Sequence, residues 1–231
     1  MKKAKIVVSK DGPYIVTGGL PMDTQISGLD ADGEPDTWVN GKKYSLQAEY
    51  NLCRCGKSKN KPFCDGSHET SHFDGTETAS RRPHAEESEI LEGPGVDVAN
   101  AYNLCVRARF CHPKGGIMEL IQNSDDPESK KAAIHEACNC PGGKLVPFDK
   151  KTGKAIEDNY RPSLSLLEDP QKGVSGPVQV KGGVAIESCD GQAYETRNRV
   201  TLCRCGESRN KPYCDGNHVD SGFNDGDKSL K

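Results

Sequence analysis

Long apolar runs are missing from this chain of 231 residues, and its apolar content is low. Apolar and aromatic residues make up 33% of the sequence, and no run approaches the roughly 20 apolar residues that a membrane-spanning helix requires. The amino terminus also lacks the apolar stretch of a secretory signal, because only residues 6–8 are consecutive strongly apolar side chains there. We therefore expect small, turn-rich cores, no membrane partner and a location in the cytoplasm.

The usual signatures of an enzyme active site are also missing. The chain contains no Ser-His-Asp set, no phosphate-binding glycine motif and no dinucleotide-binding fingerprint. Its formal net charge of -3 lacks the basic excess of a general nucleic-acid binder. These absences favour a carrier or binding protein over an enzyme with its own substrate site, and they predict no nucleic-acid partner.

Cysteine, in contrast, is abundant, and most of it lies in two copies of one motif. Segments 52–68 and 202–218 are identical at 13 of 17 positions, and six of the 11 cysteines fall within them. The spacing C-x-C-x8-C-x3-H gives one ligand set in each copy: Cys53, Cys55, Cys64 and His68 in the first, and Cys203, Cys205, Cys214 and His218 in the second. Three thiolates and one imidazole suit a tetrahedral zinc ion or a two-iron cluster.

The spacing of the first two cysteines bears on the choice between these metals. Structural zinc sites usually use C-x2-4-C pairs, whereas a single residue separates Cys53 from Cys55, and a single residue separates Cys203 from Cys205. A C-x-C pair can place two thiolates on one iron, which leaves the third cysteine and the histidine for a second iron. A zinc-binding interaction module stays open as an alternative.

Both loops resemble the CDGSH iron-sulfur family, whose pattern is C-x-C-x2-(S/T)-x3-P-x-C-D-G-(S/A/T)-H. The first loop matches at every position, and the second departs only at Asn217, where the family has a small residue. The resemblance implies a 2Fe-2S cluster on each set of three cysteines and one histidine. Family members commonly pair two chains, so two modules in one chain predict a monomer with an internal pseudo-two-fold axis.

A third group of cysteines lies between the two loops, at Cys105, Cys111 and Cys140, the last followed by Pro141. This pattern resembles the single-cluster ferredoxins and a divergent ferredoxin-like domain, in which a further cysteine occupies the place of Ala108. Three thiolates imply a 3Fe-4S cluster, and a 4Fe-4S cluster or none are the alternatives. The candidates for an extra ligand are Cys138 and His112.

The expected fold is α+β, built of small metal-stapled units. We predict a first CDGSH module at 1–80, a ferredoxin-like cluster domain at 81–160, a second CDGSH module at 161–225 and a polar tail at 226–231. Short β-type runs punctuated by Gly and Pro predict strands before each loop, and residues 149–174 are interpreted as a connection. Asp126 and Pro127 predict the start of a helix in the middle domain.

The sequence favours electron transfer by two or three clusters, with redox proteins as partners. Cluster storage and delivery to apo-acceptor proteins, or redox sensing, is the alternative. Basic residues near the loops predict either a solvated surface or a collar that docks an acidic partner. These residues are Arg54, Lys57, Lys59, Lys61, Arg204, Arg209 and Lys211.

Overall fold

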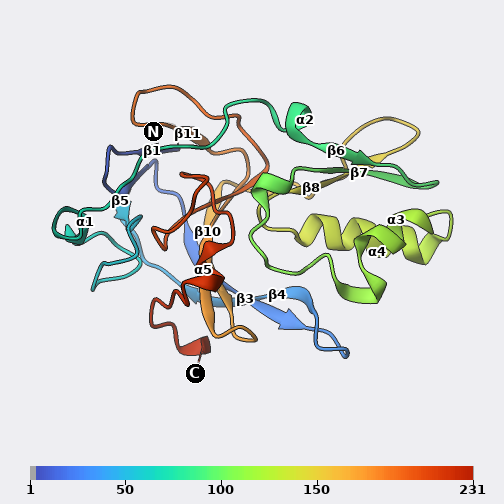
Figure 1. Cartoon of the computed structure of the whole chain (residues 1–231), viewed down its shortest axis with the longest axis horizontal. Coiled ribbons are helices and arrows are strands. Elements are labelled where there is room, and N and C mark those ends of the chain that lie inside the picture. The colour runs from blue at the N-terminus through green and yellow to red at the C-terminus, as the bar shows by residue number, and fades with distance from the viewer. Residues whose placement is uncertain (1–3, 231) are drawn as a thin grey trace.

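Three β-sheets and a few short helices make up the fold, which a computed structural model describes for residues 4–230 (Figure 1). The mixed α+β class is therefore confirmed. The first three residues of the predicted first module and the last residue of the predicted tail lie outside the described residues. Within the described part of the chain, no helix has the length and apolar character needed to cross a bilayer.

The two larger sheets contain both repeats. One has the order β11-β1-β2-β5, and the other has the order β12-β10-β9-β3-β4. The strands of the first are β1 (Lys5–Val8), β2 (Tyr14–Thr17), β5 (Glu49–Leu52) and β11 (Ala185–Glu187). Those of the second are β3 (Met22–Leu29), β4 (Pro35–Lys43), β9 (Ser163–Asp169), β10 (Val174–Lys181) and β12 (Arg199–Leu202).

The two repeats exchange strands: β11 joins the sheet of the first repeat, and β3 and β4 join the sheet of the second. Strand β11 lies parallel to β1, with Ile6 opposite Ile186, and β3 lies parallel to β9, with Met22 opposite Leu164. The hairpins that lead into the metal loops pair in the same way, because β2 is antiparallel to β5 and β10 is antiparallel to β12. Both repeats consequently contribute to both sheets, and they do not form two separate units.

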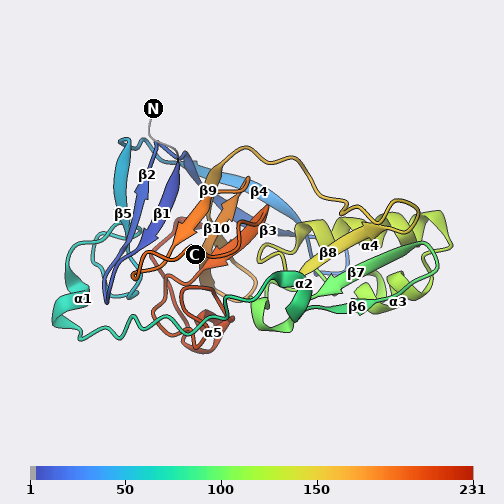
Figure 2. The same cartoon turned by 90° about the horizontal axis from the view of Figure 1, so that it is seen from above.

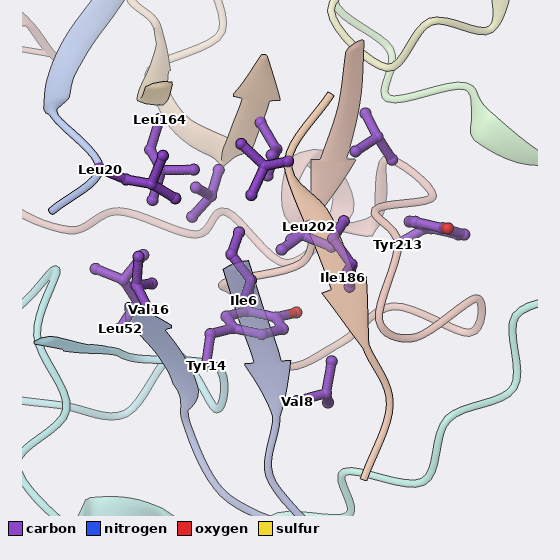
Figure 3. Close-up of a cluster of buried hydrophobic side chains, with 14 of the residues drawn as sticks. Ile6, Val8, Tyr14, Val16, Leu20, Leu52, Leu164, Ile186, Leu202 and Tyr213 are labelled. Atoms are coloured by element: carbon purple, nitrogen blue, oxygen red, sulfur yellow. The ribbon is translucent and has the colours of Figure 1, made fainter. Parts of the chain in front are cut away.

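The main core lies where these two sheets face one another (Figure 3). Strands β1 and β2 alternate buried and half-buried residues, as expected for strands with one face on a core. Strands β10 and β12 are buried along almost their whole length, because the middle unit covers their other face. There Gln179 donates to the carbonyl of Pro141 at 3.3 Å.

The interpretation of residues 149–174 as a connection was wrong, because β9 is an inner strand of the larger sheet. Polar side chains alternate with Leu164 and Leu166, so the sequence lacks the continuous apolar run expected of a buried inner strand. These polar groups are buried with partners: the Ser165 hydroxyl donates to Asp23 at 2.6 Å, and Glu168 pairs with Arg204. A polar residue can occupy a buried strand when its hydrogen bonds are satisfied.

The middle unit is a three-stranded sheet with helices packed on one side (Figure 2). Its strands are β6 (Glu89–Leu91), β7 (Val96–Asn100) and β8 (Leu145–Asp149), and its helices are α3 (Ile117–Gln122) and α4 (Pro127–Asn139). The predicted helix start is confirmed, because the Asp126 carboxylate accepts the backbone N–H of Ser129 at 2.8 Å. Remaining elements are α1 (Ser67–Thr70), α2 (His84–Glu87), α5 (Asn217–Asp220), and the 3-10 turns η1 (Tyr102–Leu104), η2 (Pro113–Gly115) and η3 (Lys228–Leu230).

An arginine of the second repeat joins the middle unit to the larger sheet. Arg199 in β12 is 2% exposed, and it donates to the carbonyls of Ala137, Cys138 and Cys140 at the end of α4. A cation at a helix C-terminus satisfies carbonyls that have no partner within the helix. The carboxylate of Glu157 balances the buried charge.

A carboxyl group on α4 predicts a pH-dependent stability. Glu136 is 2% exposed, neither of its carboxyl oxygens has a hydrogen-bond partner among the described residues, and burial raises its pKa to about 8. The folded state therefore holds this proton more tightly than the unfolded chain, so stability falls as pH rises from about 4.5 to 8. We expect Glu136→Gln to raise the unfolding free energy by about 2 kcal/mol more at pH 8.5 than at pH 6.

Urea denaturation at the two pH values measures this difference. The exposed Glu128 on the same helix provides the control, because Glu128→Gln should shift both values equally. A Glu136→Gln effect that does not change with pH would contradict the raised pKa.

Candidate metal centres

Each repeated loop holds its four predicted ligands in two pairs. In the first loop, the sulfurs of Cys53 and Cys55 lie 3.8 Å apart, and the Cys64 sulfur lies 3.4 Å from Nδ1 of His68. The corresponding distances in the second loop are 3.6 Å and 3.4 Å. The first pair follows the end of β5 or β12, and the histidine lies on the short helix α1 or α5.

This pairing is informative about nuclearity. Two thiolates bound to one ion with bonds of about 2.3 Å in tetrahedral geometry lie about 3.8 Å apart, which is close to the observed C-x-C separations. Among residues 4–230, no three Cys, His, Asp or Glu side chains converge in a way that could hold a single metal ion. The donor set thus consists of two ligand pairs in each loop, which fits two irons better than one zinc.

The thiols of the C-x-C pairs are prepared for metal binding. A hydrogen bond from Cys55 lowers the pKa of Cys53 to about 6, and one from Cys205 lowers the pKa of Cys203 to about 7. Backbone N–H groups also reach the sulfurs, because Lys57 donates to Cys55 at 3.4 Å. In each pair, the lowered pKa of one thiol favours the thiolate, which is the metal-binding form.

Short polar side chains fix the conformation of both loops through hydrogen bonds to the backbone. The hydroxyl of Ser58 donates to the carbonyl of Phe63 at 2.7 Å and accepts the N–H of Asn60 at 3.0 Å. The Asp65 carboxylate accepts the N–H groups of Lys59 and Ser67, and these bonds lower its pKa. Ser208 and Asp215 make the same bonds in the second loop. The aspartate of the motif thus fixes the loop conformation.

The arginine between the first two cysteines is buried in both loops, at 2% exposure for Arg54 and 3% for Arg204. Arg54 donates to the carbonyls of Ser9 and Gly75. Arg204 donates to backbone carbonyls and to the carboxylates of Glu168 and Asp225. These two residues therefore cannot belong to an exposed basic collar. Their repetition at the same place in both motifs was a signal of a structural role.

The two loops meet at their glycines. A Cβ atom placed on Gly56 would lie 2.7 Å from the carbonyl carbon of Cys205, and one placed on Gly206 would lie 2.9 Å from that of Cys55. Both glycines have positive φ, at 72° and 88°. The Tyr14 hydroxyl also crosses between the repeats and donates to the Cys203 carbonyl at 2.7 Å. Only glycine permits this close, reciprocal approach of the two backbones.

Comparison with known families agrees with the loop geometry. A family model described as an iron-binding zinc finger of CDGSH type matches residues 11–69 and again residues 175–219. The two repeats belong to the CDGSH family. Each CDGSH domain is accordingly an iron-binding unit of the iron-sulfur type. No curated protein and no solved structure matches the chain.

The middle unit brings three further cysteines together beside the second CDGSH domain. Cys105, Cys111 and Cys140 line one pocket with Ala108, and burial raises the pKa of Cys111 to about 11. The segment between the first two cysteines wraps the pocket with two left-handed residues, Arg107 and Arg109, at φ of 57° and 65°. Strained non-glycine residues of this kind are concentrated at binding sites.

The two candidates for an extra ligand lie elsewhere. The Cys138 sulfur contacts the carbonyl of Ile156 at 3.3 Å, and its side chain lines a different pocket with Trp38 and Tyr160. His112 is directed to Glu34, with 3.7 Å between Nδ1 and the carboxylate. The structure therefore brings three of the predicted middle ligands together and leaves Cys138 and His112 outside that group.

Proposed function

We propose that the chain carries three iron-sulfur clusters and transfers single electrons between protein partners in the cytoplasm. The ligands would be those predicted from spacing, with a 2Fe-2S cluster in each CDGSH domain and a 3Fe-4S cluster in a ferredoxin-like middle domain. When bound, an iron-sulfur cluster supplies a one-electron couple. The observation that carries the proposal is the division of each CDGSH ligand set into two pairs.

The residues around the CDGSH ligands support this role. The C-x-C cysteines of both domains are buried, and backbone N–H groups donate to ligand sulfurs, as Gly216 does to Cys214 at 3.4 Å. Burial and N–H donation to sulfur are the features by which a protein sets the potential of such a centre. A neutral imidazole in place of one thiolate would make the site less negative and favour the reduced state.

The internal pseudo-two-fold axis belongs to the same proposal. Equivalent strands are exchanged between the repeats, and the glycine contacts at Gly56 and Gly206 are reciprocal. In this arrangement, the single chain supplies both halves of the unit that other family members would build from two chains. We therefore propose a monomer.

Three thiolates around Ala108 support the 3Fe-4S assignment in the middle domain. A cubane with four irons usually has a fourth protein ligand, and the alanine at the vacant position offers no donor atom. Cys138 lies in another pocket and would take no part.

Anaerobic purification followed by iron and sulfide quantitation tests the proposal. We expect a red-brown protein with about seven irons per chain and an electron paramagnetic resonance signal in the oxidised state, because an oxidised 3Fe-4S centre is paramagnetic whereas oxidised 2Fe-2S centres are silent. Cys111→Ser should remove that signal and about three irons. Cys138→Ser, the matched control in the same unit, should change neither. A colourless protein that contains zinc and no sulfide would overturn the assignment.

Cluster delivery is the second candidate function, and the partial exposure of the first CDGSH site favours it. The side chain of His68 is 17% exposed, so an acceptor protein could reach that site. Loss of the cluster to an apo-ferredoxin at neutral pH would support delivery. Reversible reduction with full retention of iron would support electron transfer.

A further inference from the structure

The two CDGSH sites have the same backbone but different surroundings. Gly66 and Gly216 occupy equivalent positions with φ of 86° and 87°. A Cβ atom placed on Gly66 would meet nothing within 4 Å, whereas one placed on Gly216 would lie 2.7 Å from Cγ of Arg107. The difference extends to the ligands, because His68 is only partly buried while His218 is buried.

The cover over the second site is segment 105–111 of the middle unit. Ion pairs attach this segment to the second CDGSH domain. Arg107 binds Asp220 on α5 at 2.6 Å, and Arg109 binds both carboxylate oxygens of Asp169 at 2.7 Å and 3.1 Å. A bidentate arginine pair fixes orientation as well as distance. The first domain has Thr70 in the place of Asp220 and offers no such partner.

The same segment also forms the wall between two sites. Val106 and Ala108 line the pocket of the three middle cysteines, and they also line a pocket that contains His218. In both views of the molecule, α5 lies between α1 and the middle unit, and α1 lies at the far end (Figures 1 and 2). The first site therefore faces outward and the second faces the middle unit.

We propose that segment 105–111 makes the two CDGSH sites unequal: the second site is retained, and the first is the site that exchanges iron with an external partner bearing metal-binding groups. This inference rests on the proposed iron-sulfur function and assigns the exchange to one of its sites. Release of ferric iron from the first loop needs no electron. The freed thiolates and imidazole take up protons from the solvent, the chelating partner binds the iron, and sulfide leaves as hydrogen sulfide.

Chelation by EDTA under anaerobic conditions tests the inference, with visible absorption followed over time and the remaining 2Fe-2S signal quantified by paramagnetic resonance after reduction. We expect the second CDGSH site to lose iron about tenfold more slowly than the first, because segment 105–111 must open before the second ligands are reached. Cys64→Ser, which removes a first-site ligand, should abolish the fast phase and leave the slow one.

Substitutions in the ion pair that attaches segment 105–111 distinguish an effect of this cover on iron release from a general effect on folding. Arg107→Ala should accelerate the slow phase severalfold and leave the fast phase unchanged. Asp220→Asn, at the other end of the same ion pair, should act in the same direction and keeps the left-handed segment intact. Lys150→Ala, which breaks an ion pair with Asp97 within the middle unit and outside segment 105–111, is the matched control and should change neither phase.

Equal release rates from the two CDGSH domains, or a slow phase that neither cover variant accelerates, would overturn the inference. Failure of the proposed function has a different signature. A protein purified without iron and sulfide would show it before any chelator is added.

Discussion

Replacing Arg204 with methionine is expected to lower the free energy of unfolding of the metal-loaded protein by about 3 to 5 kcal/mol at pH 8.5. The guanidinium lies between two carboxylates, those of Glu168 at 2.6 Å and Asp225, and all three side chains are at most 8% exposed. Without the cation, two buried negative charges face one another with no compensating charge. Breaking a buried ion pair from one side is costly because the remaining charge cannot be hydrated.

The equivalent arginine of the first CDGSH domain is the matched control. Arg54 is buried to the same degree, but its acceptors are the neutral carbonyls of Ser9 and Gly75. Arg54→Met should therefore cost only about 1 to 3 kcal/mol, the price of unsatisfied carbonyls. If the two variants lost the same free energy of unfolding, the carboxylates beside Arg204 would make no contribution to the cost of removing it.

The loss of unfolding free energy in Arg204→Met, called the deficit below, should also depend on pH, and this dependence gives a second measurement. Burial, together with the charge of Asp225, raises the pKa of Glu168 to about 7 even with Arg204 in place. Removal of the cation should raise this pKa further, so the folded variant binds a proton at Glu168 across the neutral range. Stability of the variant then falls as pH rises through that range, and the deficit should be smaller at pH 6.5 than at pH 8.5. Urea denaturation of anaerobic protein at both values measures it.

The metal ligands could be predicted from the sequence because their chemistry is local. Three cysteines and a histidine within one loop indicate a metal site by their spacing alone. The repetition of that spacing in a second loop argues against a chance match. The partners of Arg204 could not be predicted in this way. Glu168 lies 36 residues from it in the chain, on a strand whose buried serines and acidic residue concealed it. The exchange of β3 and β11 between the repeats could not be predicted either, because the sequence of a single strand does not determine which strand it pairs with.

The middle site illustrates the same limit at short range. Spacing placed Cys138 as close to the site as any other candidate, since it is only two residues from Cys140. However, α4 ends at Asn139, and Cys140 has extended backbone with φ of -62° and ψ of 108°. The two sulfurs therefore leave the chain in different directions and enter different pockets. The cover over the second CDGSH site was also unpredictable, because the loops are nearly identical and the asymmetry comes from a unit present only once.

The close approach of the two CDGSH loops predicts the other large effect. Gly56→Ala should lower the free energy of unfolding by about 2 to 5 kcal/mol, because a left-handed residue gains a Cβ and that atom overlaps the carbonyl of Cys205. The obstacle is backbone, which cannot rotate away as a side chain can. Gly66→Ala is the matched control in the same loop, with φ of 86° and open space around the new atom. It should cost about 1 kcal/mol, the backbone penalty alone.

The reciprocal position extends this prediction to the relation between the domains. Gly206→Ala should cost as much as Gly56→Ala, because its Cβ meets the Cys55 carbonyl in the same way. The two substitutions act on one shared contact, so the double variant should lose clearly less than the sum of the single losses. Denaturant unfolding of the four proteins forms a double-mutant cycle that measures the coupling. Additive losses, or a Gly56→Ala loss no larger than that of Gly66→Ala, would mean that the loops do not meet in solution. Coupled losses would mean that the second loop is part of the structural support of the first, so that neither iron site is built by its own repeat alone.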